Sequence, residues 1–266
     1  KKTKWLEYSG VEHKAIRENV GLIDISTFSK FILQGRDAEK VINNVSANNM
    51  SVDPGSMVYT QWLNHQGGIT ADVTVTRMEE DSYMVLTSYA CHTHDFHWLK
   101  DNIGSTDHAT LTDVTAAHAG INIQGPNARK LLQKVTPEDL SNEAFPFGTS
   151  REIEIGYATV RAARISYVGE LGWELWVPSE MAIHVYEVLA EAGAEFGMAH
   201  VGMHAMNSLR TEKAYRSWGH DISDEENPIE AGLSFAVKYD KPGGFIGRDA
   251  LLKYKDSGKP KQRLVQ

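Results

Sequence analysis

Residues 64–77, which read NHQGGITADVTVTR, constrain the fold more than any other stretch of the chain. Gly67 and Gly68 predict a tight turn, because a residue without a Cβ lets the backbone bend sharply or lets a ligand approach closely. The turn leads to Asp72, which stands at the head of an alternating strand over residues 73–76. A carboxylate held there is well placed to meet a ligand, although a hairpin with a solvated acid has the same pattern.

Short strands mixed with helices predict an α+β fold rather than a parallel doubly wound sheet. The predicted strands are 30–34, 57–63, 72–78, 83–88, 120–124, 152–155, 158–166 and 173–177. The predicted helices are 11–23, a helix capped by Asp37 that carries Val41, Ile42 and Val45, one around 96–103, 180–196 and 202–215. Because successive strands are close in sequence, we expect antiparallel pairing.

The composition narrows the classes of function. The 266 residues suffice for one large or two modest domains, and the net charge of −8 argues against a nucleic-acid or anionic-membrane surface. Cys91 is the single cysteine, so no intrachain disulfide forms, as suits a reducing compartment. No apolar run is long enough for a bilayer, and no glycine-rich phosphate loop indicates FAD, NAD or ATP. Both ends suggest a segment of a longer polypeptide.

A second acid, Glu174, lies in the otherwise apolar strand 173–177. An acid that faces inward must be paired or bound to a ligand to offset its desolvation. Its two oxygens suit a ligand edge with two adjacent donors, such as an aminopyrimidinone. A cross-strand ion pair with Arg164 or Arg161 is the alternative interpretation.

Residues 207–220 predict the end of a helix followed by an aromatic and charged exit. Arg210 in this stretch has the planar fork that binds a carboxylate with two hydrogen bonds. A helix face with ordinary side-chain pairs at spacings of three and four residues is the alternative.

Three histidines close together, His92, His94 and His97, raise the question of a metal site. On a helix His94 and His97 share a face, but His92 and His94 do not. Cys91 and Asp95 are only sequence neighbours, and no Cys or Glu completes a convincing ligand set. We therefore predict a structural or surface role for these histidines and no metal.

Taken in order, several short motifs make the chain similar to the folate-binding module of the glycine-cleavage T-protein (aminomethyltransferase) family. The likeness is greatest to the C-terminal half of dimethylglycine and sarcosine dehydrogenases. The matching pieces are residues 20–26, 28–31, 59–60, 63–64, 67–72, 124–126, 139–147, 166–175, 208–219, 227–233 and 245–251. Each piece alone is modest, but their unbroken order over nearly the whole chain is specific.

The resemblance implies a T-protein-like folate-binding fold, with antiparallel sheets flanked by helices around a central cavity. It divides the chain into a discontinuous first folate-binding domain, residues 1–50 and 145–255, and a second one, residues 51–144. Residues 256–266 correspond to the start of a C-terminal barrel domain that we expect to be absent or truncated.

The resemblance also carries site residues onto this sequence. Asp72 matches the family's essential acid near the reacting nitrogens of tetrahydrofolate. Glu174 matches the acid that grips the two-donor edge of the pterin, with Tyr167 beside it. The further folate-binding residues are Tyr59, Arg210 and Trp218. Trp218 stands where the family often has a tyrosine, and Ala71-Asp72 stands where T-proteins commonly carry two acids, which favours the dehydrogenase branch.

The resemblance implies an enzyme: an aminomethyltransferase-like module that captures the iminium of an N-methyl amine, of dimethylglycine or sarcosine type, as 5,10-methylene-tetrahydrofolate. A folate-dependent demethylase that forms 5-methyl-tetrahydrofolate and a non-catalytic folate-binding regulatory module are the alternatives. The expected cofactor is tetrahydrofolate, with FAD only in a fused or partner domain outside this chain. The expected partners are the methylamine-derived substrate and a flavoprotein domain or subunit, in a bacterial cytoplasm or a mitochondrial matrix.

Overall fold

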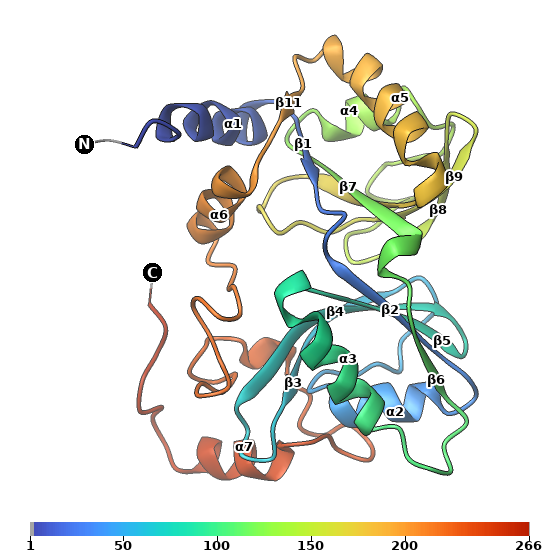
Figure 1. The fold of residues 1–266 in the computed structure, drawn as a ribbon. Helices are drawn as coiled ribbons and strands as arrows, with labels where there is room; N and C mark the ends of the chain where they lie inside the picture. Colours follow the sequence, from blue (N-terminus) through green and yellow to red (C-terminus); the bar gives the residue numbers. More distant parts are fainter. Residues whose placement is uncertain (1–2, 266) are drawn as a thin grey trace. The chain divides into compact units, whose positions relative to one another are not determined.

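The computed structural model describes residues 3–265 and divides them into two compact units (Figure 1). Unit 1 comprises the chain up to Thr27 together with Thr115–Tyr215. Unit 2 comprises Phe28–Val114 together with the chain from Arg216 onward. Each unit holds its own sheet and its own hydrophobic core.

Unit 1 is built around a sheet whose described strands follow the order β11-β1-β7-β10-β9-β8. Its strands are β1 (Gly21–Asp24), β7 (His118–Gln124), β8 (Ser150–Ile155), β9 (Ala158–Ala163), β10 (Gly172–Pro178) and β11 (Ala199–His200). Its helices are α1 (Leu6–Glu18), α4 (Ala128–Leu132), α5 (Ala182–Ala194) and α6 (Met203–Glu212). The described pairings are antiparallel apart from β1 with β11, which is parallel.

The two faces of this sheet differ in character because side chains alternate along each strand. Ile123 on β7 and Trp173 and Leu175 on β10 are fully buried in the core that includes Leu131 of α4 and Leu189 of α5. On β10 the residues between them, including Glu174, therefore point to the opposite face of the sheet.

Unit 2 holds a sheet whose described strands follow the order β3-β4-β5-β2-β6. Its strands are β2 (Ser29–Gln34), β3 (Met57–Leu63), β4 (Ile69–Glu79), β5 (Ser82–Thr87) and β6 (Thr110–Asp113), all paired antiparallel. Its helices are α2 (Ala38–Val45), α3 (His92–Asp101) and α7 (Arg248–Asp256). Val41 and Ile42 of α2 and Leu99 of α3 are buried against the sheet's apolar side chains.

The carbonyls at the end of α2 have an unusual partner. Lys241 is buried, and its Nζ donates to the carbonyls of Asn43 at 2.6 Å and Asn48 at 2.8 Å, and also to that of Ser46. An ammonium has three donors and so matches three carbonyls. Lys241 therefore links the loop before α7 to the connection between α2 and β3 within unit 2.

The α+β class and the antiparallel sheets flanked by helices are confirmed, and most predicted elements form within a few residues of their expected ends. The helix predicted over residues 11–23 is wrong at both ends. Helix α1 spans Leu6–Glu18, and Gly21, which lies within the predicted helix, opens β1. The cause is tertiary, because β1 is held by pairing with β7 on one side and β11 on the other.

The boundaries between the compact units follow Thr27, Val114 and Tyr215. The predicted boundaries of the folate-binding domains follow residues 50, 144 and 255. Packing units and family domains are different divisions of a chain, so the predicted domain division stays a prediction. Beyond Asp256, where α7 ends, the described residues 257–265 form neither helix nor strand.

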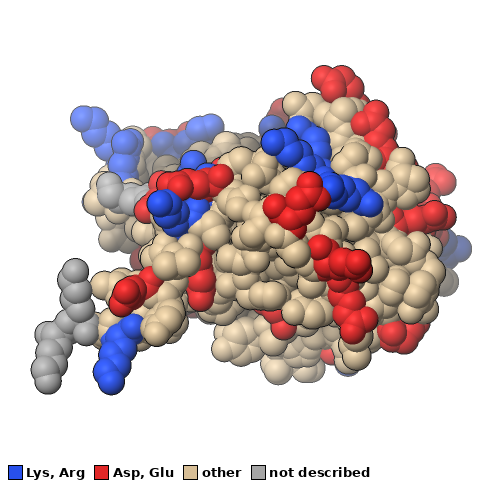
Figure 2. Space-filling view, turned by 90° about the horizontal axis from the view of Figure 1, so that it is seen from above, with Lys and Arg blue, Asp and Glu red and all other residues tan. Residues whose placement is uncertain are grey.

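The surface shows mixed charges. On the face seen in Figure 2, acidic and basic side chains are interspersed rather than gathered by sign. Among the described residues no helix is long and apolar enough to cross a membrane.

Candidate functional site

Asp72 lies inside β4, opposite Gln61 of β3, and not at the head of the strand as predicted. Strand β4 begins earlier, at Ile69, because its pairing with β3 continues past an irregularity. Trp62 pairs with Ala71 and Leu63 with Ile69, so the residue between them, Thr70, has no partner in the register. Such a bulge bends a strand and re-aims nearby side chains, and is frequent beside active sites.

The Asp72 carboxylate is held by two donors from β3. Gln61 Nε2 donates to its Oδ1 at 2.9 Å, and the Tyr59 hydroxyl is a second donor. Burial nevertheless raises the pKa of Asp72 to about 6, against the opposing effects of these hydrogen bonds and of the positive charge of Arg216. Near neutral pH this carboxyl group is therefore able to exist in both forms, as proton transfer requires.

Trp218 joins the same part of unit 2. Its Nε1 donates to the carbonyl of Ile69 at 2.8 Å, the residue where β4 begins. Tyr59 stacks on Phe235, with ring centroids 6.2 Å apart. Unit 2 thus brings three of the predicted site residues, Tyr59, Asp72 and Trp218, to the start of β4.

Glu174 presents a carboxylate that is only partly exposed and that has no hydrogen bond or ion pair among residues 3–265. The alternative of a cross-strand ion pair is wrong, since Arg161 pairs with Glu152 at 3.2 Å and Arg164 donates to the carbonyl of Phe145 at 2.6 Å. Burial raises the pKa of Glu174 to about 7. An acid in such a position lacks the partner that would offset its desolvation, and a ligand with two donors would supply it.

The neighbours of Glu174 on β7 are polar as well. Asn122 stands directly across from Glu174, and Gln124 across from Gly172, so all face the same side of the sheet. Gln124 Nε2 donates to Asn122 Oδ1 at 2.7 Å and to the carbonyl of Ile165 at 3.0 Å. The buried Gln124 Oε1 has no partner, so this amide adds an acceptor to the Glu174 surroundings.

Tyr167 lies on the loop 164–171, between β9 and β10. Its ring stacks on that of Tyr215, with centroids 6.2 Å apart and planes 23° from parallel. Gly169 on the same loop has a φ of +73°, a backbone conformation that residues other than glycine rarely adopt. The loop therefore carries a predicted folate-binding aromatic on a sharply bent backbone.

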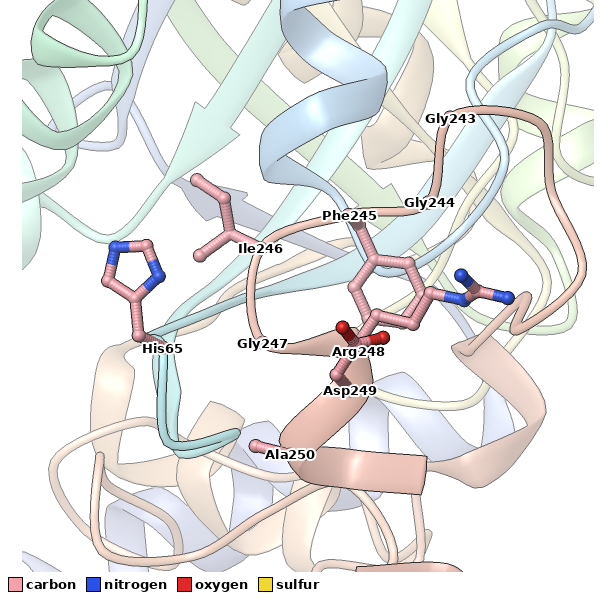
Figure 3. A pocket seen from close by; sticks show the side chains of 9 residues that line it. All are labelled: His65, Gly243, Gly244, Phe245, Ile246, Gly247, Arg248, Asp249 and Ala250. Atoms are coloured by element: carbon pink, nitrogen blue, oxygen red, sulfur yellow. The ribbon is translucent and has the colours of Figure 1, made fainter. Parts of the chain in front are cut away.

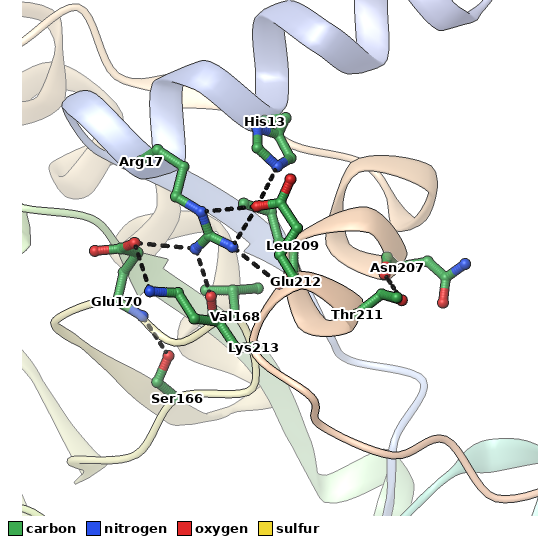
Figure 4. A network of polar contacts seen from close by, with 10 residues as sticks. All are labelled: His13, Arg17, Ser166, Val168, Glu170, Asn207, Leu209, Thr211, Glu212 and Lys213. Carbon is green, nitrogen blue, oxygen red and sulfur yellow. Dashed lines mark hydrogen bonds and ion pairs between the residues drawn. The ribbon is translucent and has the colours of Figure 1, made fainter. Parts of the chain in front are cut away.

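This loop is fixed from outside by Arg17 of α1, a residue that the sequence did not single out (Figure 4). Arg17 Nη1 donates to the carbonyl of Val168 at 2.6 Å and to Glu170 Oε1 at 3.0 Å. The backbone N–H of Glu170 in turn donates to Ser166 Oγ at 3.1 Å. Arg17 thereby holds the segment on both sides of its glycine turn.

Arg210 is buried at the end of α6 and is engaged by its own surroundings. Its Nε donates to Asn207 Oδ1 at 2.8 Å and its Nη1 to the carbonyl of Tyr215 at 3.1 Å. These bonds support the chain where it leaves the helix through Ala214, whose φ is +58°. Within unit 1, Arg210 is thus linked to Tyr167 through Tyr215, and its predicted contact with folate stays a prediction.

The three histidines of α3 have three different sets of partners. His92 contacts Ser29 Oγ at 2.9 Å and Asp113 at 3.3 Å, whereas His97 lies edge-on to Phe96. His94 contacts Asp95 at 2.8 Å and the hydroxyl of Thr70 at 3.2 Å. Among the described residues no three His, Cys, Asp or Glu side chains are grouped to hold a metal ion.

A separate pocket of about 340 Å³ lies in unit 2 at the start of α7 (Figure 3). It is lined by His65 and by residues 243–250, with the Arg248 and Asp249 side chains at its rim. None of the six predicted site residues lines it. The pocket therefore adds no group to the chemistry of Asp72 or Glu174.

Four polar residues near the site were not singled out as site residues by sequence reasoning, namely Arg17, Gln61, Asn122 and Gln124. Gln61 and Gln124 had a usable signal, because each is a polar residue within an apolar strand next to a matched motif. Arg17 had none, since its partners are more than 150 residues away in the sequence.

Comparison with known proteins extends this description. Residues 1–241 match the family model described as the GCVT N-terminal domain. The chain is 41% identical to the 4-methylaminobutanoate oxidase (formaldehyde-forming) of Paenarthrobacter nicotinovorans, over 98% of this chain and 31% of that protein. It is 38% identical to the mitochondrial dimethylglycine dehydrogenase of Mus musculus, over 100% of this chain and 30% of that protein. The chain thus spans about a third of the length of these relatives.

Among solved structures, the chain is similar to the glycine cleavage system aminomethyltransferase T from Bartonella henselae. The TM-score is 0.84 and the sequence identity 25%, over 95% of this chain and 67% of that one. The likeness covers both compact units, so the T-protein-like fold predicted from the sequence is confirmed.

Proposed function

Because the chain belongs to the GCVT N-terminal domain family, we propose that it captures, on tetrahydrofolate, the one-carbon unit of an iminium derived from an N-methyl amine. The product of this transfer is 5,10-methylene-tetrahydrofolate. The observation that carries the proposal is Glu174, a carboxylate without a partner among residues 3–265 whose pKa burial raises to about 7.

The residues present fit a folate. When bound, tetrahydrofolate supplies two nucleophilic nitrogens, N5 and N10, that accept the carbon. The two oxygens of Glu174 match the adjacent N–H donors of the pterin's aminopyrimidinone edge, and an ionised Glu174 regains in those bonds what burial costs it. The free Gln124 Oε1 offers a further acceptor on the same face of the sheet. Tyr167, on a loop braced by Arg17, offers a flat surface for stacking.

Asp72 is assigned to proton transfer. Its two hydrogen bonds from β3 fix the carboxylate in place, and its raised pKa keeps both protonation states accessible near neutral pH. A positioned acid or base of this kind contributes typically about 10²–10⁴-fold to a rate.

The donor is proposed to be an N-methylated amino acid. Two relatives are named for 4-methylaminobutanoate and for dimethylglycine, which share an N-methyl amine and a carboxylate. Oxidation of such an amine to the iminium belongs to a flavin, which we place in a fused or partner flavoprotein. The compartment is proposed to be a bacterial cytoplasm or a mitochondrial matrix.

Calorimetric titration of the chain with tetrahydrofolate, without oxygen, tests the folate site. We expect Glu174→Gln, which keeps the side chain's shape, to weaken binding at least tenfold, or about 1.4 kcal/mol. Glu154→Gln is the matched control, because Glu154 is an exposed acid on β8 of the same sheet. Equal affinities for the two variants would contradict the role of Glu174.

Product analysis then tests the reaction. The chain is supplied with an iminium made from formaldehyde and sarcosine, and the rate above the spontaneous condensation is measured. Formation of 5,10-methylene-tetrahydrofolate, lost in Asp72→Asn, supports the proposal. Formation of 5-methyl-tetrahydrofolate from an S- or O-methyl donor instead indicates a demethylase, and binding without any transfer indicates a regulatory module.

A further inference from the structure

An aspartate and a histidine form a pair on α3. His94 Nδ1 lies 2.8 Å from Asp95 Oδ1, while the Thr87 hydroxyl donates to the other oxygen of Asp95. Asp95 is fully buried, and the His94 side chain is 48% exposed. The carboxylate thus sits behind the ring and orients it, which is the arrangement that makes Nδ1 the protonated nitrogen and leaves Nε2 as the base.

The pair borders the residues assigned above to the folate site in unit 2. His94 Nε2 lies 3.2 Å from the hydroxyl of Thr70, the bulge residue two positions before Asp72. The ring of His94 stacks on that of Trp218, with centroids 6.3 Å apart and planes 21° from parallel. The negative charge of Asp95 is close enough to Asp72 to act on its ionisation. His94 therefore contacts the surroundings of two predicted site residues.

The surroundings of His94 accommodate both protonation states of the ring. Its partner at Nε2 is a hydroxyl, which donates to the neutral ring and accepts from the protonated one. An ionised Asp95 favours the protonated ring.

We propose that His94, oriented by Asp95, is a second proton-transfer group of the folate site, taking up a proton at Nε2 and returning it to the departing amine. This inference rests on the proposed function. In the overall transfer, the two bonds between carbon and the iminium nitrogen are replaced by two carbon–nitrogen bonds to folate. Two protons leave the folate nitrogens and both end on the amine, which departs as an ammonium ion. No electrons are exchanged, and the two protons match two carriers, Asp72 and His94.

The titratable groups near His94 come from two elements. Asp72 is the titratable group on β4. His92 and Asp95 lie on α3, and Cys91 lies in the turn before it. The charges of Asp72 and Asp95 also act on Cys91. Burial raises the pKa of the Cys91 thiol to about 11, so this group stays neutral in the relevant range. The acid limb of a rate profile is thus expected to report Asp72.

The experiment compares His94→Gln with His97→Gln in the whole chain. Glutamine keeps a hydrogen-bonding side chain at position 94 but does not titrate, and His97 is an exposed residue of the same helix. We expect His94→Gln to bind tetrahydrofolate within about twofold of the unchanged chain. We expect its rate of iminium capture at saturating folate to fall about 10²-fold, with a changed pH profile. His97→Gln is expected to behave as the unchanged chain.

A second readout needs no turnover. Long-range ¹H–¹⁵N spectra of the histidine rings, with His94 assigned by its absence in His94→Gln, are expected to show the Nδ1–H form. Asp95→Asn is expected to lose this preference for the Nδ1–H form. Tetrahydrofolate is expected to shift the His94 signals and not those of His97.

Two results would overturn the inference. One is a His94→Gln chain with the rate and pH profile of His97→Gln, and the other is a His94 ring that folate leaves unchanged. If the unchanged chain itself fails to bind tetrahydrofolate or to form methylene-folate, the proposed function fails first and this inference with it. The two failures are therefore distinguishable.

Discussion

Replacing Asp72 with asparagine is expected to stabilise unit 2 above pH 6 while it removes transfer activity. Burial raises the pKa of Asp72 from its ordinary 3.8 to about 6 in the folded chain. A group whose folded pKa is raised contributes stability that is fully present below the unfolded pKa and is lost as the pH rises through the folded pKa. Asparagine has no charge to desolvate and still accepts the hydrogen bond from Gln61.

The magnitude follows from the shift. One pKa unit corresponds to about 1.36 kcal/mol, so a rise of about two units corresponds to about 3 kcal/mol between pH 4 and pH 7. This is an upper value, because water still reaches part of the Asp72 side chain. We therefore expect the unfolding free energy of Asp72→Asn, relative to the unchanged chain, to grow by at least about half of this amount over that range.

Urea unfolding at pH 4.5, 6 and 8, followed by tryptophan fluorescence, measures this difference. Asp53→Asn is the control, because Asp53 is an exposed acid of the same unit. A gain that is the same at pH 4.5 and pH 8 would refute the reasoning, because it would show that ionisation of Asp72 costs the folded chain nothing. A substitution that raises the stability of the chain while it removes activity is typical of a functional group that is strained in the folded state.

Two further predictions concern Lys241 and Glu174. Burial lowers the pKa of Lys241 to about 7, so the ammonium form is present at pH 6. At that pH Lys241→Met leaves three carbonyls without their ammonium donor and is expected to lower the unfolding free energy by about 3 kcal/mol in urea. Lys238→Met, at an exposed position, is expected to change it by less than about 0.5 kcal/mol, and equal losses would contradict the assignment. Folate binding is expected to weaken about tenfold per pH unit below about 7, because the pterin edge requires an ionised Glu174. Calorimetry between pH 5.5 and 8 measures this, and a flat profile would count against Glu174 as the ligand.

Local patterns predicted those elements whose signal lies within the element itself. Strand β3 was predicted at the residues that form it, and α2 buries Val41, Ile42 and Val45 as their spacing indicates. The four residues of β1 have no such signal, and the first three of them fall within the helix predicted over residues 11–23. Their strand exists because β7 and β11 pair with it, and both partners come from elsewhere in the sequence.

The site residues show the same division between local sequence signals and tertiary contacts. The sequence showed that Glu174 is an acid in an apolar strand, but left an ion pair with Arg161 or Arg164 open. The structure gives those two cations other partners, and so leaves the Glu174 carboxylate without one among the described residues. For His94 the sequence raised the question of a metal, whereas the structure pairs its ring with Asp95 and Thr70.

The sequence by itself determined the α+β class, the order of the family motifs and the identity of the acids, because these depend on residue type and local spacing. The tertiary structure decided which of those acids have partners. Asp72 is held by Gln61 from a neighbouring strand, and Trp218 reaches β4 from 149 residues away. Burial and hydrogen bonding set the protonation of a carboxyl group, and both depend on residues that only folding brings together.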